Sequence, residues 1–137
     1  MTNDRLSKNY IEKATRRLKL LPILIQDGGY SDVIRESQAI VELALKGLLR
    51  YIGVEPPRWH DVSSILIEHL DKLPLEIQQD IQKIRKISKR LRRERELAFY
   101  GDDNFIPDEE FDITDAEEAQ NWAIYIVQLV KSHCVFK

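Results

Sequence analysis

Arginine and lysine side chains gather in one short stretch of this chain. Eight Lys or Arg residues and a single acid, Glu94, lie between Lys83 and Arg95. Cationic side chains bind phosphate, and the planar fork of arginine can hold two phosphate oxygens at once. We predict phosphate or nucleic-acid contacts from four of these side chains and from a tyrosine that follows them: Lys89, Arg92, Arg93, Arg95 and Tyr100.

The next stretch carries the opposite charge. Nine Asp or Glu residues and no Lys or Arg lie between Asp102 and Glu118. Two interpretations stay open. The basic stretch is either a free surface whose phosphate binding weakens as salt rises, or a solvated helix whose field the nearby acids cancel by pairing with it.

Arg95 has an unusual position within the basic stretch. At helical spacing it lies in the apolar stripe, in line with Ile84 and Leu91. Burying an unpaired guanidinium is very costly, so we expect a partner for it: Glu42, Asp32, a carboxylate of another subunit, or a phosphate. The alternative is that the side chain extends to the edge of the bundle.

The remaining reactive side chains are scattered. His60, His69 and His133 stand alone, without the spacing of a metal site, so neither a metal nor another cofactor is expected. We interpret His60 as a helix-entry residue, with a role as a base as the alternative. The single cysteine, Cys134, is expected to be inert. No phosphate-binding glycine loop and no nucleophile elbow is present.

Size and composition predict one globular domain, spanning residues 1–137. With 43% apolar and 32% charged residues, the chain can bury a core. The net charge of −2 confines any attraction for nucleic acid or membrane to local patches. One cysteine argues for a reducing compartment. The longest apolar run, Leu20 to Ile25, is too short to span a bilayer, and no secretory signal opens the chain. We therefore expect a cytoplasmic protein.

Apolar residues recur at spacings of three and four along most of the chain, which is typical of amphipathic helices. We predict helices over residues 3–27 with a kink or a break at Pro22, from Ser31 or Gly29 to Ile52, from Asp61 as N-cap to Leu73, from Leu75 to Tyr100, and from a Thr114–Glu117 capping box onward. Residues 101–113 are predicted to form a connection. The expected fold is an all-α, up-and-down antiparallel bundle of four long or moderate helices and one short helix.

Three pieces of the sequence resemble the HEPN domains of prokaryotes. The first is Gly29-Tyr30 followed by Ser37-Gln38-Ala39 and the segment 42–49 (ELALKGLL). The second is Pro57 with His60-Asp61-Val62 and Ile65-Leu66. The third is the basic helix that ends in Phe99-Tyr100-Gly101-Asp102, followed by an acidic, capped last helix. Together they cover most of the chain in the family's order.

The resemblance implies a homodimeric helical bundle that often pairs with a small nucleotidyltransferase. Ribonucleases of this family carry Arg, four residues, His, one residue and Tyr near the end of the basic helix. Arg93 and Tyr100 occupy matching positions here, but Ala98 stands where the histidine is expected. A methyl group cannot take the proton of a 2′-hydroxyl, whereas an imidazole titrates near neutral pH. Tyr100 is either a hydroxyl that the partner modifies or an aromatic side chain that closes the helix.

Three hypotheses about function follow. The leading one is a dimeric module that binds a nucleotide, a nucleic acid or a nucleotidyltransferase partner through Arg93, Arg95, Tyr100 and their neighbours, in a toxin–antitoxin-like system. The second is a divergent metal-independent ribonuclease that uses Arg93, Tyr100 and another base, such as His60. The third is a helical adaptor that docks another protein and has no catalytic role.

Overall fold

The computed structural model describes residues 2–58, 61–99 and 103–136, and within these ranges it contains helices and no β-strand. The long helices are α1 (Thr2–Arg17), α3 (Tyr30–Tyr51), α6 (Ile81–Phe99) and α8 (Ile113–His133). Short helices connect them: α2 (Leu20–Gln26), α4 (Val62–Glu68), the 3₁₀ helix η1 (Leu70–Lys72), α5 (Leu75–Gln79) and α7 (Pro107–Glu110). The predicted all-α bundle is confirmed, although it has more short helices than the one expected.

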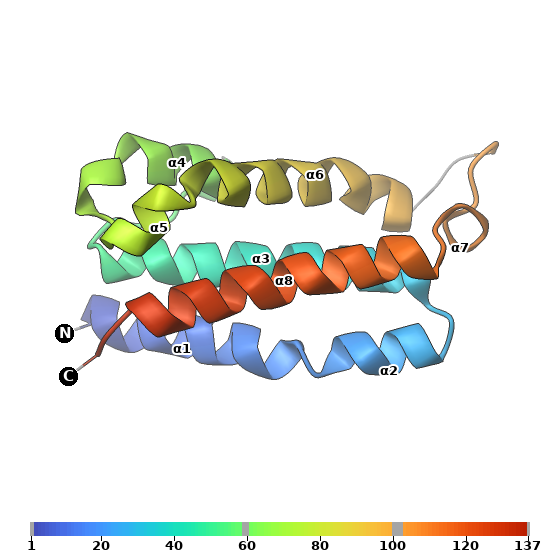
Figure 1. Cartoon of the computed structure of the whole chain (residues 1–137), viewed down its shortest axis with the longest axis horizontal. Helices are drawn as coiled ribbons and strands as arrows, with labels where there is room; N and C mark the ends of the chain where they lie inside the picture. Colours follow the sequence, from blue (N-terminus) through green and yellow to red (C-terminus); the bar gives the residue numbers. More distant parts are fainter. Residues whose placement is uncertain (1, 59–60, 100–102, 137) are drawn as a thin grey trace.

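Helix α3 is the centre of the bundle. It packs against α1, α6 and α8, and its apolar stripe supplies much of the core. Figure 1 shows the long helices lying beside one another in alternating directions, with the two termini at the same end of the bundle. Helices α6 and α8 contact α3 far more extensively than they contact each other. The side chains along the seam between α6 and α8 therefore border an open surface.

A close approach fixes α1 against α3. A Cβ added at Gly47 would lie 2.9 Å from Cγ1 of Ile11, so only glycine fits at this crossing. The hydroxyl of buried Ser7 donates a 2.6 Å hydrogen bond to the carbonyl of Gly47. These contacts hold the first helix at one axial position along α3.

The first predicted helix is divided in two, so of the kink or break expected at Pro22 the structure has a break, and it lies a few residues before the proline. Helix α1 ends at Arg17 and α2 begins at Leu20. Because Pro22 has no N–H to offer the carbonyl of Leu18, that carbonyl accepts instead from the N–H of Leu21 at 3.2 Å. The tighter turn breaks the helix before the proline rather than at it.

The helices between residues 61 and 99 also differ from prediction. Asp61 caps α4 as expected, accepting a 3.0 Å hydrogen bond from the N–H of Ser63, but α4 ends at Glu68 rather than at Leu73. The expected single helix from Leu75 consists of α5 and α6, separated at Asp80. The Asp80 carboxylate accepts a 2.6 Å hydrogen bond from the Tyr125 hydroxyl of α8. This contact joins the break to the last helix.

The last helix starts earlier than the sequence suggested. Its capping box is formed by Asp112 and Asp115, whose carboxylates accept from each other's backbone N–H at 2.9 and 3.0 Å. The predicted box of Thr114 and Glu117 is therefore wrong by two residues. The connection before it contains α7, where Asp108 accepts a hydrogen bond from the hydroxyl of Ser31. No helix among the described residues is long and apolar enough to cross a membrane.

Candidate phosphate-binding site

The basic stretch forms most of α6, and three of its arginines meet in one pocket. This pocket, of about 460 Å³, lies between α3, α6 and the segment before α4, and we call it the arginine pocket. Its lining consists of four arginines, two glutamates and one amide: Arg58, Arg92, Arg93, Arg95, Glu42, Glu96 and Gln38. Four guanidiniums against two carboxylates leave the pocket with an excess of positive charge.

The arginines of the pocket remain available to a ligand. All four are exposed, and among the described residues none of them forms an ion pair. Glu42 instead accepts from the Gln38 amide at 3.3 Å and lies 3.8 Å from the Lys46 ammonium. Unpaired guanidiniums that share a small volume repel one another, and an anion placed among them relieves that repulsion.

Gln38 lines the inner side of the arginine pocket. The residue is only 4% exposed, and its side-chain oxygen is buried with no described group donating to it. Buried polar atoms nearly always have a partner, and leaving one without a partner costs about 1–3 kcal/mol. Because this oxygen is covered, the groups that the pocket offers to a ligand are the exposed guanidiniums.

Of the two outcomes expected for Arg95, burial with a partner and extension to the edge of the bundle, the structure agrees with the second. The Arg95 side chain is exposed and faces the arginine pocket, not the core. The flank of α6 is open there, so the guanidinium keeps its hydration and avoids the cost of burial. Of the partners proposed from sequence, Glu42 lines the same pocket without pairing to Arg95, and Asp32 does not line it.

A second depression lies on the other side of α6, along its seam with α8. This α6–α8 groove has a volume of about 500 Å³. Five cations, one isoleucine and one tryptophan line it: Lys83, Lys86, Lys89, Arg90, Arg93, Ile87 and Trp122. Arg93 lines both depressions, so the groove and the arginine pocket meet at its side chain.

Two cations of the groove lie over aromatic rings of α8, and one of these rings, Trp122, lines the groove itself. The Lys83 ammonium lies 4.0 Å from the ring centre of Tyr125, and the Arg90 guanidinium lies 5.6 Å from that of Trp122. Burial, and then the hydrogen bond to Asp80, raises the pKa of Tyr125 above its usual value. The phenol therefore stays neutral, and its ring gives Lys83 an attractive surface without a competing negative charge.

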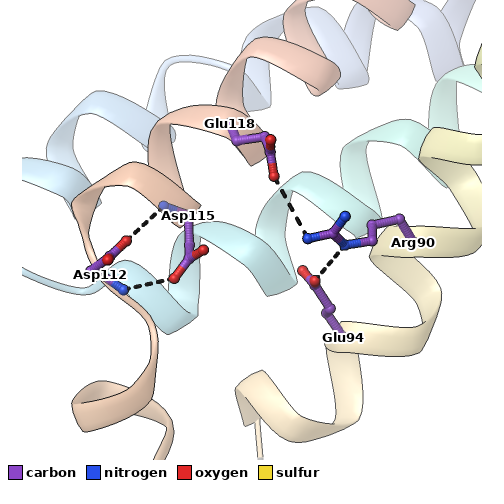
Figure 2. A network of polar contacts seen from close by, with 5 residues as sticks. All are labelled: Arg90, Glu94, Asp112, Asp115 and Glu118. Carbon is purple, nitrogen blue, oxygen red and sulfur yellow. Dashed lines mark hydrogen bonds and ion pairs between the residues drawn. The ribbon is translucent and has the colours of Figure 1, made fainter.

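Arg90 is the basic residue of α6 that the acidic segment engages. Figure 2 shows its guanidinium between Glu94 of α6, at 2.7 Å, and Glu118 of α8, at 3.8 Å. The hydrogen bond to Glu94, and then the charge of that carboxylate, raises the pKa of Arg90. Asp112 and Asp115 are occupied with each other at the start of α8 (Figure 2). Among the described residues, the acidic segment therefore neutralises little of the basic one.

The structure distributes the predicted site residues over two places. Arg92, Arg93 and Arg95 come together in the arginine pocket, whereas Lys89 lies in the α6–α8 groove. His60 and Tyr100 lie outside the described residues.

Sequence reasoning missed Gln38, Arg58 and Trp122 as site residues. A polar Gln38 four residues before Glu42, within an apolar stripe, was a usable signal. Nothing in the sequence marks Trp122 or Arg58 as a site residue.

The described residues offer no obvious alternative centre of reaction. No group of three or more His, Cys, Asp or Glu among them could hold a metal ion. His133 lies 3.6 Å from Glu76, far along the chain from the basic stretch. Burial raises the pKa of the Cys134 thiol to about 12, which keeps it protonated and weakly nucleophilic near neutral pH.

The described residues form an all-α bundle whose basic helix α6 borders a pocket rich in arginine. The chain belongs to the HEPN family, because the model of the HEPN domain matches residues 7–133. Its fold is similar to the crystal structure of an archaeal HEPN homologue, with 28% sequence identity and a TM-score of 0.69. That similarity covers 94% of this chain and 98% of the archaeal one. A search of curated proteins finds no match.

The end of α6 is the part of the chain where ribonucleases of the HEPN family are expected to carry their Arg and His. The position at which ribonucleases of the family are expected to carry histidine is Ala98, which is 3% exposed and belongs to the core. Arg93, five residues earlier, is exposed and faces the two depressions. The methyl group of Ala98 therefore packs in the core. Arg93 is exposed, and position 98 supplies no imidazole beside it.

Proposed function

We propose that this HEPN protein is a dimeric module that binds the phosphates of a nucleotide or a nucleic acid in the arginine pocket. The observation that carries the proposal is the convergence of Arg58, Arg92, Arg93 and Arg95 on one cavity without ion pairs among the described residues. Arginine forks suit phosphate oxygens, which they can hold two at a time.

The pocket favours binding over cleavage. Cleavage of RNA without a metal needs a group that takes the 2′-hydroxyl proton, and a positioned base contributes a factor of about 10²–10⁴. Ala98 supplies no such group. The ribonuclease alternative depends on Arg93 and Tyr100 at the family's spacing together with a base from elsewhere, such as His60. The adaptor alternative requires internal pairing of the basic segment, yet Arg90 is the member of that segment that pairs among the described residues.

Dimerisation and a partner complete the proposal. Large apolar side chains remain exposed where α6 ends and α7 and α8 begin, namely Leu97, Ile106 and Ile113 at 41%, 52% and 45%. Covering such residues is a common reason for self-association. We further propose that the dimer pairs with a small nucleotidyltransferase in a toxin–antitoxin-like system. A neighbouring reading frame that encodes such an enzyme, and its copurification with this protein, would support the pairing.

Binding of ATP and of a short RNA to purified protein tests the phosphate-binding proposal. Arg95→Ala and Arg93→Ala should each weaken ATP binding about tenfold or more, because a hydrogen bond to a charged group contributes about 1.5–3 kcal/mol. Affinity should also fall as salt rises. Arg5→Ala removes the same charge from an exposed position on α1 and is the matched control. Equal affinities for the parent protein and both pocket variants would rule the proposal out.

A further inference from the structure

We infer that the α6–α8 groove is a second subsite that binds the backbone of a single-stranded nucleic acid, and that the strand continues past Arg93 into the arginine pocket. The inference rests on the proposed function and narrows it, because a free nucleotide would fill one pocket only. The observation behind it is that Arg93 lines both depressions. A ligand that occupies both must be longer than one nucleotide.

The cations of the groove are spaced as a ladder. Lys83, Lys86, Lys89 and Arg93 follow one another at intervals of three or four residues, which places them along one side of a helix. At about 1.5 Å per residue, the ladder from Lys83 to Arg93 extends roughly 15 Å along α6. Repeated cations over that length match a linear chain of phosphates better than they match a single anion.

Two members of the ladder have no competing partner. Lys86 and Lys89 are exposed, and within the described ranges neither forms an ion pair. In the part of the chain that the structure describes, Lys83 forms no ion pair, and its ammonium lies over the ring of Tyr125, where a cation can still contact a phosphate. No carboxylate among the described residues lines the groove, and Glu94 and Glu118 pair with Arg90, which does line it. Lysines that form no ion pair within the protein can bind phosphates, and this binding releases counterions.

The walls of the groove suit bases as well as phosphates. Trp122 and Ile87 contribute apolar surface between the cations, and Trp122 is partly exposed. Bases of a single strand stack on aromatic rings without strong sequence preference. Trp122 also packs against the core and lies beside the Arg90 guanidinium. An acidic protein segment would use the cations but not the exposed part of this ring, so a nucleic-acid strand is the occupant that accounts for both kinds of side chain.

The test compares a long and a short ligand on full-length protein. Oligouridylate of about twelve nucleotides should bind more tightly than ATP and with a steeper dependence on salt. Lys86→Ala/Lys89→Ala should weaken binding of the oligonucleotide about tenfold at low salt and leave ATP binding unchanged. Each lost phosphate contact removes about 0.7 from the slope of log affinity against log salt, so the double variant should lose about 1.4. Lys13→Ala/Arg16→Ala, with the same spacing on exposed positions of α1, is the control.

A second measurement reports on the groove directly. The chain has two tryptophans, so Trp59→Phe leaves Trp122 as the only one. Oligouridylate should quench its fluorescence, and ATP should not.

Different results would rule out the groove subsite and the proposed function. If the double variant keeps the parent's affinity and salt slope while Arg95→Ala weakens both ligands, the groove is not a subsite and the proposed function stands. If the parent protein binds neither ATP nor RNA, the proposed function fails and the inference falls with it. Binding of oligoglutamate but not of oligouridylate at the groove would also overturn the inference, in favour of an acidic protein partner.

Discussion

The guanidinium groups of the arginine pocket repel one another, because all of them are positively charged. Arg92, Arg93 and Arg95 occupy one turn of α6, and Arg58 approaches from the segment before α4. Solvent reduces the mutual repulsion of these charges because all four side chains are exposed, and the carboxylates of Glu42 and Glu96 offset part of the rest. The arrangement is therefore tolerable without a counterion, and a phosphate bound as proposed would lower the remaining repulsion.

Restoring the histidine of the family's nuclease pattern should not restore a nuclease. Ala98 is 3% exposed, so Ala98→His forces a larger, polar ring into a packed core. We expect the free energy of unfolding to fall by roughly 1–3 kcal/mol, the usual cost of overpacking, and no gain of RNA cleavage. Urea denaturation and a cleavage assay on mixed RNA measure the two effects.

Gln82→His is the matched control for that experiment. It introduces the same ring into the same helix, at an exposed position that lines neither depression, and should leave stability nearly unchanged. A stable Ala98→His variant that cleaves RNA would contradict the prediction and would favour the ribonuclease hypothesis.

At the scale of the helix, the start of α8 shows how local sequence can mislead. Asp112 with Asp115 and Thr114 with Glu117 both have the spacing of a capping box. The chain uses the earlier pair, and Phe111, the residue before that cap, packs against the core. Tertiary packing of a flanking aromatic residue thus selects between two caps that local preferences rank almost equally.

Substitution of the observed cap should therefore matter more than substitution of the apparent one. Asp112→Ala removes the acceptor for the Asp115 N–H and should lower the free energy of unfolding by about 1 kcal/mol. Thr114→Ala, at an exposed position inside the first turn, should change it by less than about 0.5 kcal/mol. Urea denaturation of the two variants side by side gives the comparison, and the opposite ranking would mean that the helix starts at Thr114 in solution.

Regular periodicity predicted the helices well, and long-range contacts account for the corrections. The stripe of Tyr30–Tyr51 marked α3 along its whole length because every turn of it is packed. The break at Asp80 was missed because its hydrogen bond to Tyr125 joins residues far apart in the chain. The cations of the site were visible as a cluster in the sequence. Their division between a pocket and a groove was not, because it depends on Gln38 and Trp122, which other helices contribute.

At the scale of the whole molecule, stability should decline on the alkaline side. Burial raises the pKa of Cys134 from an ordinary value near 9.0 to about 12, and the pKa of Tyr125 is raised as well. Between about pH 9 and 12 the unfolded chain loses the thiol proton while the folded chain keeps it. The free energy of unfolding should therefore fall in this window, at up to about 1.4 kcal/mol per pH unit for the thiol.

Cys134→Ala isolates the contribution of the thiol. The variant should lose stability less steeply above pH 9 than the parent, whatever its offset at neutral pH. Chemical denaturation at a series of pH values measures both slopes, and identical slopes would show that the thiol ionises equally in the folded and unfolded chains.

The bundle carries its eight basic residues of α6 beside an acidic segment while its net charge is only −2. The positive and negative charges of such a molecule are separated in space, but their sum is small. In physiological salt its field fades within about 8 Å, so a polyanion drifting nearby is not drawn in from afar. Encounter rates should then be close to those of uncharged partners, and selectivity must arise from how long a correctly oriented strand stays bound.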